Sequence, residues 1–412
     1  MRDLAVFSSL RHDQYRRLWL ATLLSTVASW TVLTGRGWFA FDLHHHSSTV
    51  GLVFFAAMLP YLLVTPVAGV LADRFDRRGL LLASLVISLL SALALALYAL
   101  GGGRAAWPLV VLAFVNGAAR SVEVPASQSM VPAMVPERDL LNAVALGGLA
   151  THGSRLLGPL LAAPLLDSSG AAGAFFLATA MYVIALVQVF RVQAVIQATS
   201  RTIGAGAQLL EGARYVLRDR VVLLIIGLVF FHCGLSMAYD AVLPVMAHDV
   251  LGSGGTSYSW LVMMIGLGSL IGTFALAGLP TGIHRGWLLF ATGMLSGFTI
   301  VLLAFAHRWP EALGAAALVG GSQAIFMALT NTILQIVTPD WVRGRVLSIY
   351  LMVGGGVMAF ANLVTGRLAD AYGVTLVLAL PALAFMAIVA LSLLGPPIRR
   401  VYLRRAAPVA VH

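Results

Sequence analysis

The sequence contains no lysine, a single cysteine and few charged residues of any kind. Charged residues occupy 10% of the 412 positions, whereas about a quarter is usual for a soluble domain, so most of the surface cannot face water. The lone Cys233 excludes an internal disulfide. The sequence also lacks a phosphate-binding glycine loop, a metal-ligand cluster and a nucleophile–base pair. We therefore expect neither an enzyme nor a bound cofactor or metal.

The chain consists mostly of long apolar runs. Hydrophobic residues make up 60% of it, and the mean hydropathy is +0.92. A membrane-spanning helix needs roughly 20 apolar residues. These features predict an all-α membrane protein in a lipid bilayer. The twelve predicted spans lie near residues 16–41, 49–72, 79–101, 107–134, 139–166, 170–190, 221–247, 257–279, 286–306, 311–337, 345–369 and 373–395.

The arginines indicate which side of the membrane each loop occupies. All 26 basic residues are arginines, and twenty of them fall on one side of the predicted spans, together with both termini. Loops rich in positive charge stay in the cytoplasm, so we expect both termini to be cytoplasmic and the protein to lie in the plasma membrane, the inner membrane of a bacterium. Because the arginines sit at span ends and not on a soluble patch, nucleic acid is not an expected partner.

The two halves of the chain resemble each other. The turn at 73–78 corresponds to 281–285, and the segment at 134–138 corresponds to 337–345, with offsets of about 203 to 207 residues. This repeat predicts two pseudo-symmetric six-helix bundles, at 1–190 and 221–412, the second carrying a basic cytoplasmic tail. The linker at 191–220 has apolar residues at helical spacing between arginines, which predicts an amphipathic helix on the membrane surface.

One charged turn carries a family resemblance. The stretch Gly69-Val-Leu-Ala-Asp73-Arg74-Phe-Asp-Arg77-Arg78 resembles the signature between helices two and three of the major facilitator superfamily. The resemblance implies a transporter of that fold with a cytoplasmic gate, in which the acid at Asp73 interacts with the start of helix eleven near Arg345. The gate would comprise Gly69, Asp73, Arg74, Arg77, Arg78 and Arg345. An alternative is that these arginines only anchor the topology. Asp76 stands where the family usually has glycine.

Three further stretches resemble the bacterial exporter branch that includes the enterobactin exporter and macrolide efflux proteins. They are residues 10–19, residues 154–159 and residues 210–216. Within the second, Gly158-Pro159 resembles the span-five signature of antiporters, although Leu-Leu-Ala-Ala follows where the family has a glycine pair. An ordinary proline kink is the alternative interpretation of this motif.

Six charged residues fall within the predicted spans. A charge at the centre of a membrane helix costs roughly 2.5–3.5 kcal/mol on insertion scales, so such residues usually face a cavity or one another. Three acids and three arginines suggest a balanced interior. Because Arg120 and Glu123 are three residues apart on one span, and Arg155 lies mid-span on the next, we expect these three to form one cluster. The six are Arg36, Asp42, Arg120, Glu123, Arg155 and Asp240.

The acids are candidates for proton coupling. Glu123 lies inside span four, and Asp240 precedes Pro244 near a predicted helix break, where a cavity can reach it. Asp42 is a third candidate, although at the outer end of span one it could simply be solvated. The intramembrane arginines Arg36, Arg120 and Arg155 would supply the opposing charge, or else only a structural ion-pair network.

These features together predict a secondary active transporter. We expect proton-coupled efflux of a small organic molecule (a drug, a macrolide or a siderophore-like compound) by a monomer that alternates access between two sides. The alternatives are an importer of a small metabolite, or a non-transporting receptor or assembly protein on the same scaffold. The protons, the small-molecule substrate and the lipid bilayer are the expected partners.

Overall fold

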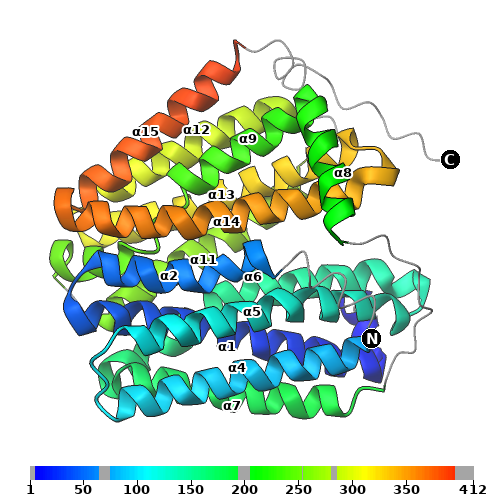
Figure 1. Cartoon of the computed structure of the whole chain (residues 1–412), viewed down its shortest axis with the longest axis horizontal. Coiled ribbons are helices and arrows are strands. Elements are labelled where there is room, and N and C mark those ends of the chain that lie inside the picture. Colours follow the sequence, from blue (N-terminus) through cyan, green and yellow to red (C-terminus); the bar gives the residue numbers. More distant parts are fainter. Residues whose placement is uncertain (1–4, 65–74, 194–204, 253, 280–284, 395–412) are drawn as a thin grey trace.

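The computed structural model describes residues 5–64, 75–193, 205–252, 254–279 and 285–394 (Figure 1). Within these ranges the chain is helical and contains no strand. The long helices are α1 (Asp13–His44), α2 (Ser47–Leu63), α4 (Arg77–Leu100), α5 (Trp107–Met130), α6 (Glu137–Ser168), α7 (Gly170–Phe190), α8 (Ala205–Arg218), α9 (Arg220–Leu235), α11 (Gly255–Ala277), α12 (Arg285–Ala304), α13 (Trp309–Val337), α14 (Asp340–Tyr372) and α15 (Val374–Ser392).

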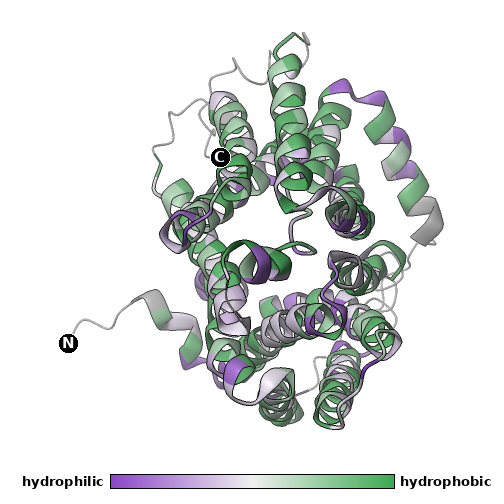
Figure 2. Cartoon of the chain, turned by 90° about the vertical axis from the view of Figure 1, so that its left-hand side faces the viewer, coloured by the Kyte–Doolittle hydropathy of each residue, from purple (hydrophilic) through white to green (hydrophobic). Residues whose placement is uncertain are grey.

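Most of these helices have the length and composition of membrane spans. In the described part of the chain, nine are long and apolar enough to cross a bilayer, and α2 and α9 are shorter apolar helices. Helix α6 is long enough but carries charges at both ends and at Arg155, which lower its hydropathy. Figure 2 looks along the helices and shows apolar residues over most of their surface. The prediction of a multi-pass membrane protein is confirmed.

The helices pack as two groups with separate cores. Helices α1, α2, α4, α5, α6 and α7 form the N-terminal group, whose core includes Val53, Leu85 and Phe175. Helices α9 to α15 form the C-terminal group, with cores around Leu261 and Phe326. The groups lie one below the other in Figure 1 and meet where α2 packs on α14 and α6 on α11. Each group therefore has a core of its own, although Val245 joins the N-terminal core and Trp38 packs against both.

We name the two ends of the helix bundle by the parts of the chain that lie there. The terminal end is where α1 begins and α7 ends, linked by a hydrogen bond from Arg17 Nη1 to the Arg191 carbonyl (2.7 Å). The distal end is where α1 ends at His44 and α11 begins at Gly255. Helix α8 lies at the terminal end, on the right of Figure 1.

The span predicted at 221–247 is interrupted in the structure. Helix α9 ends at Leu235, residues 236–242 are irregular, and a short α10 (Leu243–Val245) and a π-helix (Met246–Val250) follow. Side chains of neighbouring helices satisfy the freed backbone groups, since Gln323 Nε2 donates to the Ser236 carbonyl (2.8 Å) and the Ala241 N–H donates to Asn362 Oδ1 (3.1 Å). A break before Pro244 was expected, and it begins earlier, at Ser236.

The predicted linker helix is present as α8. Its buried side, which includes Val216, packs on α14 and α9, while Leu210 and Leu217 stay exposed. Glu211 pairs with Arg345 of α14 (2.7 Å), and Tyr215 lies edge-on to Trp341. One side of the amphipathic helix thus binds protein, not lipid.

Candidate functional site

The two groups approach most closely in the distal half of their interface. A Cβ placed on Gly51 of α2 would lie 2.5 Å from the Asn362 carbonyl of α14, and one on Gly366 would lie 2.5 Å from the Ser47 carbonyl. A Cβ placed on Gly266 of α11 would likewise lie 2.5 Å from the Arg155 carbonyl of α6. Real Cβ atoms do not come this close, so only glycine allows the backbones to meet here.

Two carboxylates reinforce this closed end. Asp370, near the end of α14, accepts hydrogen bonds from the Ser47 and Ser48 N–H groups at the start of α2 (2.7 and 3.0 Å). Asp167, near the end of α6, accepts one from the Thr256 N–H at the start of α11 (3.1 Å). In each case an acid of one group binds the positive N-terminus of a helix in the other group.

The terminal half of α6 faces open space. Among the described residues no atom lies within 4 Å of a Cβ placed on Gly147, Gly148 or Gly153. Leu141, nearly two turns before Gly147, is 82% exposed. In contrast, a Cβ on Gly158 would collide with Trp30 of α1. Between α6 and α11 the interface is therefore closed at the distal end and open along the terminal half of α6, whereas α2 and α14 stay in contact as far as Tyr61, whose Cβ lies 2.9 Å from a Cβ placed on Gly355.

The antiporter-like motif lies at the boundary between these halves. Pro159 has no N–H, so the Arg155 carbonyl four residues earlier lacks its helical donor and is the atom that Gly266 approaches. The Gly158 carbonyl accepts a hydrogen bond from Thr31 Oγ1 of α1 (3.3 Å). The motif thus joins α6 to one helix of each group.

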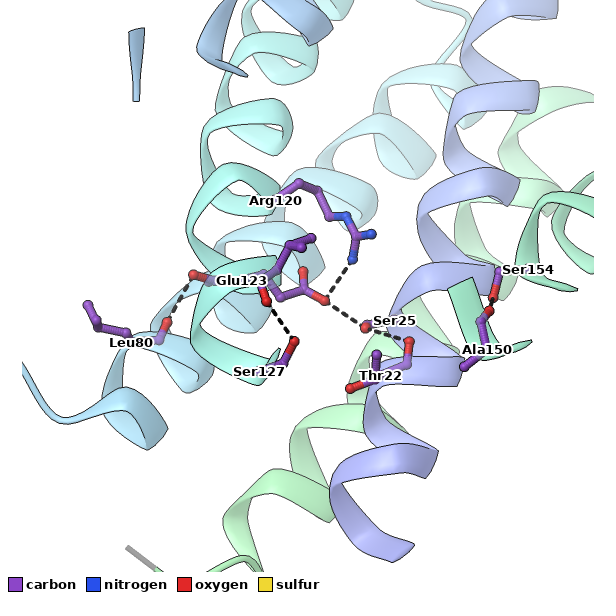
Figure 3. Close-up of polar contacts among 10 residues, drawn as sticks. Thr22, Ser25, Leu80, Arg120, Glu123, Ser127, Ala150 and Ser154 are labelled. Atoms are coloured by element: carbon purple, nitrogen blue, oxygen red, sulfur yellow. Dashed lines mark hydrogen bonds and ion pairs between the residues drawn. The ribbon is translucent and has the colours of Figure 1, made fainter. Parts of the chain in front are cut away.

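Arg120 and Glu123 form a buried ion pair inside the N-terminal group (Figure 3). Glu123 Oε1 accepts from Arg120 Nη1 and from Ser25 Oγ of α1, both at 2.7 Å. The Glu123 residue is 3% exposed, and its Oε2 has no hydrogen-bond partner. The predicted pairing within one helix is therefore present, and half of the carboxylate is left without a donor.

Arg155 does not complete the expected cluster of three. Its guanidinium donates to the Tyr239 hydroxyl (3.1 Å) and lies over the Trp30 ring, 5.2 Å from the centroid. Tyr239 in turn donates to Gln323 Oε1 (3.0 Å). No ion pair joins Arg155 to Glu123 in the described part of the chain, because α6 turns this side chain toward the helix break of the C-terminal group.

Arg36 is buried at the same interface without a counterion. It is 3% exposed, its Nη1 has no hydrogen-bond partner, and no carboxylate of the described residues pairs with it. The adjacent Gly37 contacts the Tyr258 hydroxyl of α11. Arg36 interacts electrostatically with the hydroxyls of Tyr182 of α7 and Tyr258 of α11, and Asp240 interacts with Tyr258 and with Arg155. These electrostatic interactions connect both groups.

The remaining acids differ in exposure. Asp42 is exposed near the distal end of α1, as expected for a solvated carboxylate. Asp240 is partly buried in the irregular segment, where the described residues provide neither a hydrogen bond nor an ion pair for its side chain. The balance of three acids and three arginines therefore does not hold in the interior: Asp42 lies outside it, and three arginines face two acids.

The predicted cytoplasmic gate is only partly described. Gly69, Asp73 and Arg74 lie outside the described residues. Arg77 Nη1 donates to the Ser129 carbonyl (2.7 Å), and Arg78 donates to the Val189 and Phe190 carbonyls (3.3 and 2.8 Å). These contacts join the start of α4 to the ends of α5 and α7.

Asp76, the departure from the family pattern, has a local role. Its carboxylate accepts hydrogen bonds from the backbone N–H groups of Arg78 (3.3 Å) and Gly79 (2.9 Å). It is therefore the N-cap of α4, which satisfies two donors that would otherwise be unpaired. A pattern of acid followed by a helix start could have indicated this role in the sequence.

Comparison with known proteins identifies the family. A family model described as "Transmembrane secretion effector", a branch of the major facilitator superfamily, matches residues 4–401. The chain belongs to this family. It is therefore a membrane transporter and not an enzyme.

Relatives of this transporter include named efflux and siderophore proteins. It is 23% identical to the "Staphyloferrin A transporter" of Staphylococcus aureus, over 86% of this chain and 89% of that one. It is 26% identical to the "Multidrug efflux pump Tap" of Mycolicibacterium fortuitum, over 83% and 87%. The "Enterobactin exporter EntS" of Escherichia coli is also 26% identical, over 68% and 67%. The resemblance to the exporter branch is confirmed.

Solved structures show the same fold at low sequence identity. A "POT family transporter in complex with 5-aminolevulinic acid" superposes on the transporter with a TM-score of 0.76 at 13% identity, over 93% of this chain and 96% of that one. The "nucleoside transporter NupG" gives a TM-score of 0.74 at 12% identity, over 93% and 99%. At this identity the likeness concerns the fold alone.

Proposed function

We propose that this transporter exports small organic molecules in exchange for protons by alternating access. The observation that carries the proposal is the interface between the two groups. It is closed at the distal end, open along the terminal half of α6, and holds Arg36, Arg155 and Asp240 between these parts. An interface of this kind can open at one end as it closes at the other, which exposes a central site to each side in turn.

The arrangement we propose for this mechanism has twelve spans in two six-helix bundles, 1–190 and 221–412, joined by the linker at 191–220. Its terminal end would face the cytoplasm, because most arginines lie on that side. The protein would then be a monomer in the bacterial inner membrane, with the distal end closed to the outside in the state described above.

Glu123 is the first candidate for carrying the proton. One of its oxygens binds Arg120 and Ser25, and the other is buried without a donor. Protonation would cancel the charge that holds Arg120, and it would give the unpaired oxygen a hydrogen to donate. Such a change stabilises one orientation of the transporter over the other. Asp240, for which the described residues provide no hydrogen bond or ion pair beside the helix break, is the second candidate, and Asp42 is the third.

We retain the gate at the terminal end as part of this proposal. In the state closed at that end, Asp73 would bind the N-terminus of α14, where an acid is worth roughly 0.3–1 kcal/mol. Arg345 lies in the second turn of α14 and pairs with Glu211 of α8 in the present state. Arg77 and Arg78 would hold the turn against α5 and α7 through the carbonyl contacts described above.

Glu123→Gln tests the proposed coupling. In proteoliposomes that contain the purified transporter, we expect a pH gradient to drive efflux of a substrate dye in the wild type and not in the variant. Glu137→Gln, which removes an exposed acid at the start of α6, is the matched control and should keep wild-type efflux. Efflux by Glu123→Gln that still follows the pH gradient would remove Glu123 from the mechanism. Reversing the gradient distinguishes an exporter from an importer.

A further inference from the structure

Arg36 raises a problem that the proposed cycle does not solve. Arginine stays charged at any pH a cell experiences. A buried charge without a partner is strongly unfavourable, and such charges in native structures are paired or bind an ion. Arg36 is 3% exposed, and the described residues offer it neither an acid nor an acceptor for Nη1. Closing the distal end therefore buries an unneutralised cation.

The surroundings of Arg36 suit an anion. Arg36 lies within electrostatic range of the Tyr182 hydroxyl of α7 in its own group and of the Tyr258 hydroxyl of α11 in the other group, and Tyr258 is also within range of Asp240. Arg155 is held in place by Tyr239 and Trp30 but has no carboxylate paired with it. Among the described residues, Arg36 Nη1 and Arg155 Nε are both buried without a hydrogen-bond partner, and Asp240 is ion-paired with neither arginine. The site has an excess of one positive charge.

The donors and rings also indicate the kind of anion. A guanidinium presents two parallel N–H groups that match the two oxygens of a carboxylate. The Tyr258 hydroxyl is a further donor at the same interface, whereas the single hydrogen of the Tyr239 hydroxyl is already donated to Gln323. Trp38 stacks on Tyr258, with ring centroids 6.3 Å apart, and Trp30 lies under Arg155. Cationic donors beside aromatic faces favour an organic carboxylate over a small inorganic ion.

We propose that Arg36, with Arg155, binds a carboxylate of the transported molecule, so that the substrates of this transporter are organic anions. This inference rests on the proposed transport function and adds to it the chemical class of the cargo. The bound carboxylate neutralises Arg36, which makes closure of the distal end more favourable with substrate than without it.

Binding of two dyes tests the proposal. Carboxyfluorescein carries free carboxylates, whereas rhodamine 123 has the same ring system with an esterified carboxyl and a positive charge. With the purified full-length transporter, we expect fluorescence polarisation to detect carboxyfluorescein binding, and Arg36→Gln to weaken it at least tenfold. Arg36→Lys, which keeps the charge but loses the paired donors, should weaken binding less. Arg104→Gln, an arginine between α4 and α5, is the control and should leave it unchanged.

The thermal melting temperature separates a binding role from a structural one. Because Arg36→Gln removes an unpaired buried charge, the ligand-free variant should melt at or above the wild-type temperature. The stabilisation that carboxyfluorescein confers on the wild type should be lost. Failure of both Arg36 variants to fold would make Arg36 a structural residue and overturn the proposal.

The remaining outcomes distinguish this inference from the proposed function. Binding and efflux of rhodamine 123 without binding of carboxyfluorescein would overturn the organic-anion inference and leave the exporter intact. Binding of carboxyfluorescein that depends on Arg36, without movement across proteoliposomes under either gradient, would support the anion site and contradict the exporter. Full displacement of the dye by chloride at equal concentration would show that the site binds inorganic anions. That result would overturn the proposal that it binds an organic carboxylate.

Discussion

The distal and terminal ends of the interface are held in different ways. At the distal end, backbones meet at Gly51 and Gly366, and Asp370 binds the start of α2 across the two groups. At the terminal end, none of the described atoms lies within 4 Å of a Cβ placed on Gly147 or Gly148 of α6. The ion pair between Glu211 and Arg345 at this end joins two helices on the same side of the interface. The closed end thus combines polar contacts and glycine approaches with apolar packing across the groups, in which Val245 joins the N-terminal core and Trp38 packs against both cores.

This difference indicates how the two groups could move relative to each other without unfolding. In the proposed cycle each group would keep most of its apolar core during a rotation, and the contacts across the interface would be exchanged. The contact between a carboxylate of one group and a helix N-terminus of the other also occurs in both halves of the chain. Asp167 and Asp370 are 203 residues apart, and the first residues of α2 and α11 are 208 apart, close to the offset that relates the two halves of the sequence. The repeat therefore extends to the contacts that close the interface.

The largest effect is expected from Gly266→Ala. The new Cβ would lie 2.5 Å from the Arg155 carbonyl, so α6 and α11 could not reach their closed distance. We expect dye efflux in proteoliposomes to fall at least tenfold. Gly148→Ala adds the same methyl group where no described atom lies within 4 Å, and it should keep efflux within twofold of the wild type. Equal effects of the two substitutions would contradict the contrast between the ends.

An intermediate effect is expected from removing the two distal acids together. Asp167→Asn with Asp370→Asn replaces charged acceptors at two helix N-termini, each worth about 0.3–1 kcal/mol. We expect the population with an open distal end to rise several-fold. Spin labels at exposed distal sites, such as Arg104 and Arg308, would report this as a longer distance component. An unchanged distance distribution would show that the glycine contacts alone close this end.

The smallest effect is expected from Glu211→Gln at the terminal end. The pair with Arg345 is partly exposed, with side-chain exposures of 46% and 22%, and exposed pairs contribute about 0–1 kcal/mol. Because the pair lies within the C-terminal group and its linker, its loss should leave the distal distance unchanged and alter efflux by less than about threefold, in the same spin-label and proteoliposome assays. A shift of the distal distance would show that α8 controls the interface.

Much of the fold could be predicted from the sequence because it depends on local composition. Long apolar runs predicted the membrane helices, and the spacing of Arg120 and Glu123 predicted an ion pair that is present at 2.7 Å. The break in the helix at 236–242 was placed slightly too late, because Pro244 was the visible signal whereas Gln323 and Asn362, on other helices, stabilise the irregular backbone.

The site was harder to predict because its contacts join distant parts of the chain. Arg155 was expected beside Glu123 because their helices are consecutive, but the direction in which α6 turns its side chain brings it to Tyr239, 84 residues away. Tyr239 and Tyr258 were not among the candidates, since a tyrosine in an apolar helix carries no signal of its partners. Asp370 was also missed, because its acceptor role at the start of α2 spans 323 residues.

The sequence by itself determined the class of molecule, the membrane helices, the family and the presence of charges inside the spans. These follow from hydropathy and short spacings, which act within one helix. Only the tertiary structure decided that Glu123 is paired while Arg36 is not, and that one end of the interface is closed. The reason is physical: whether a buried charge is neutralised depends on the side chains that neighbouring helices bring within a few ångströms, and that depends on how the two groups pack.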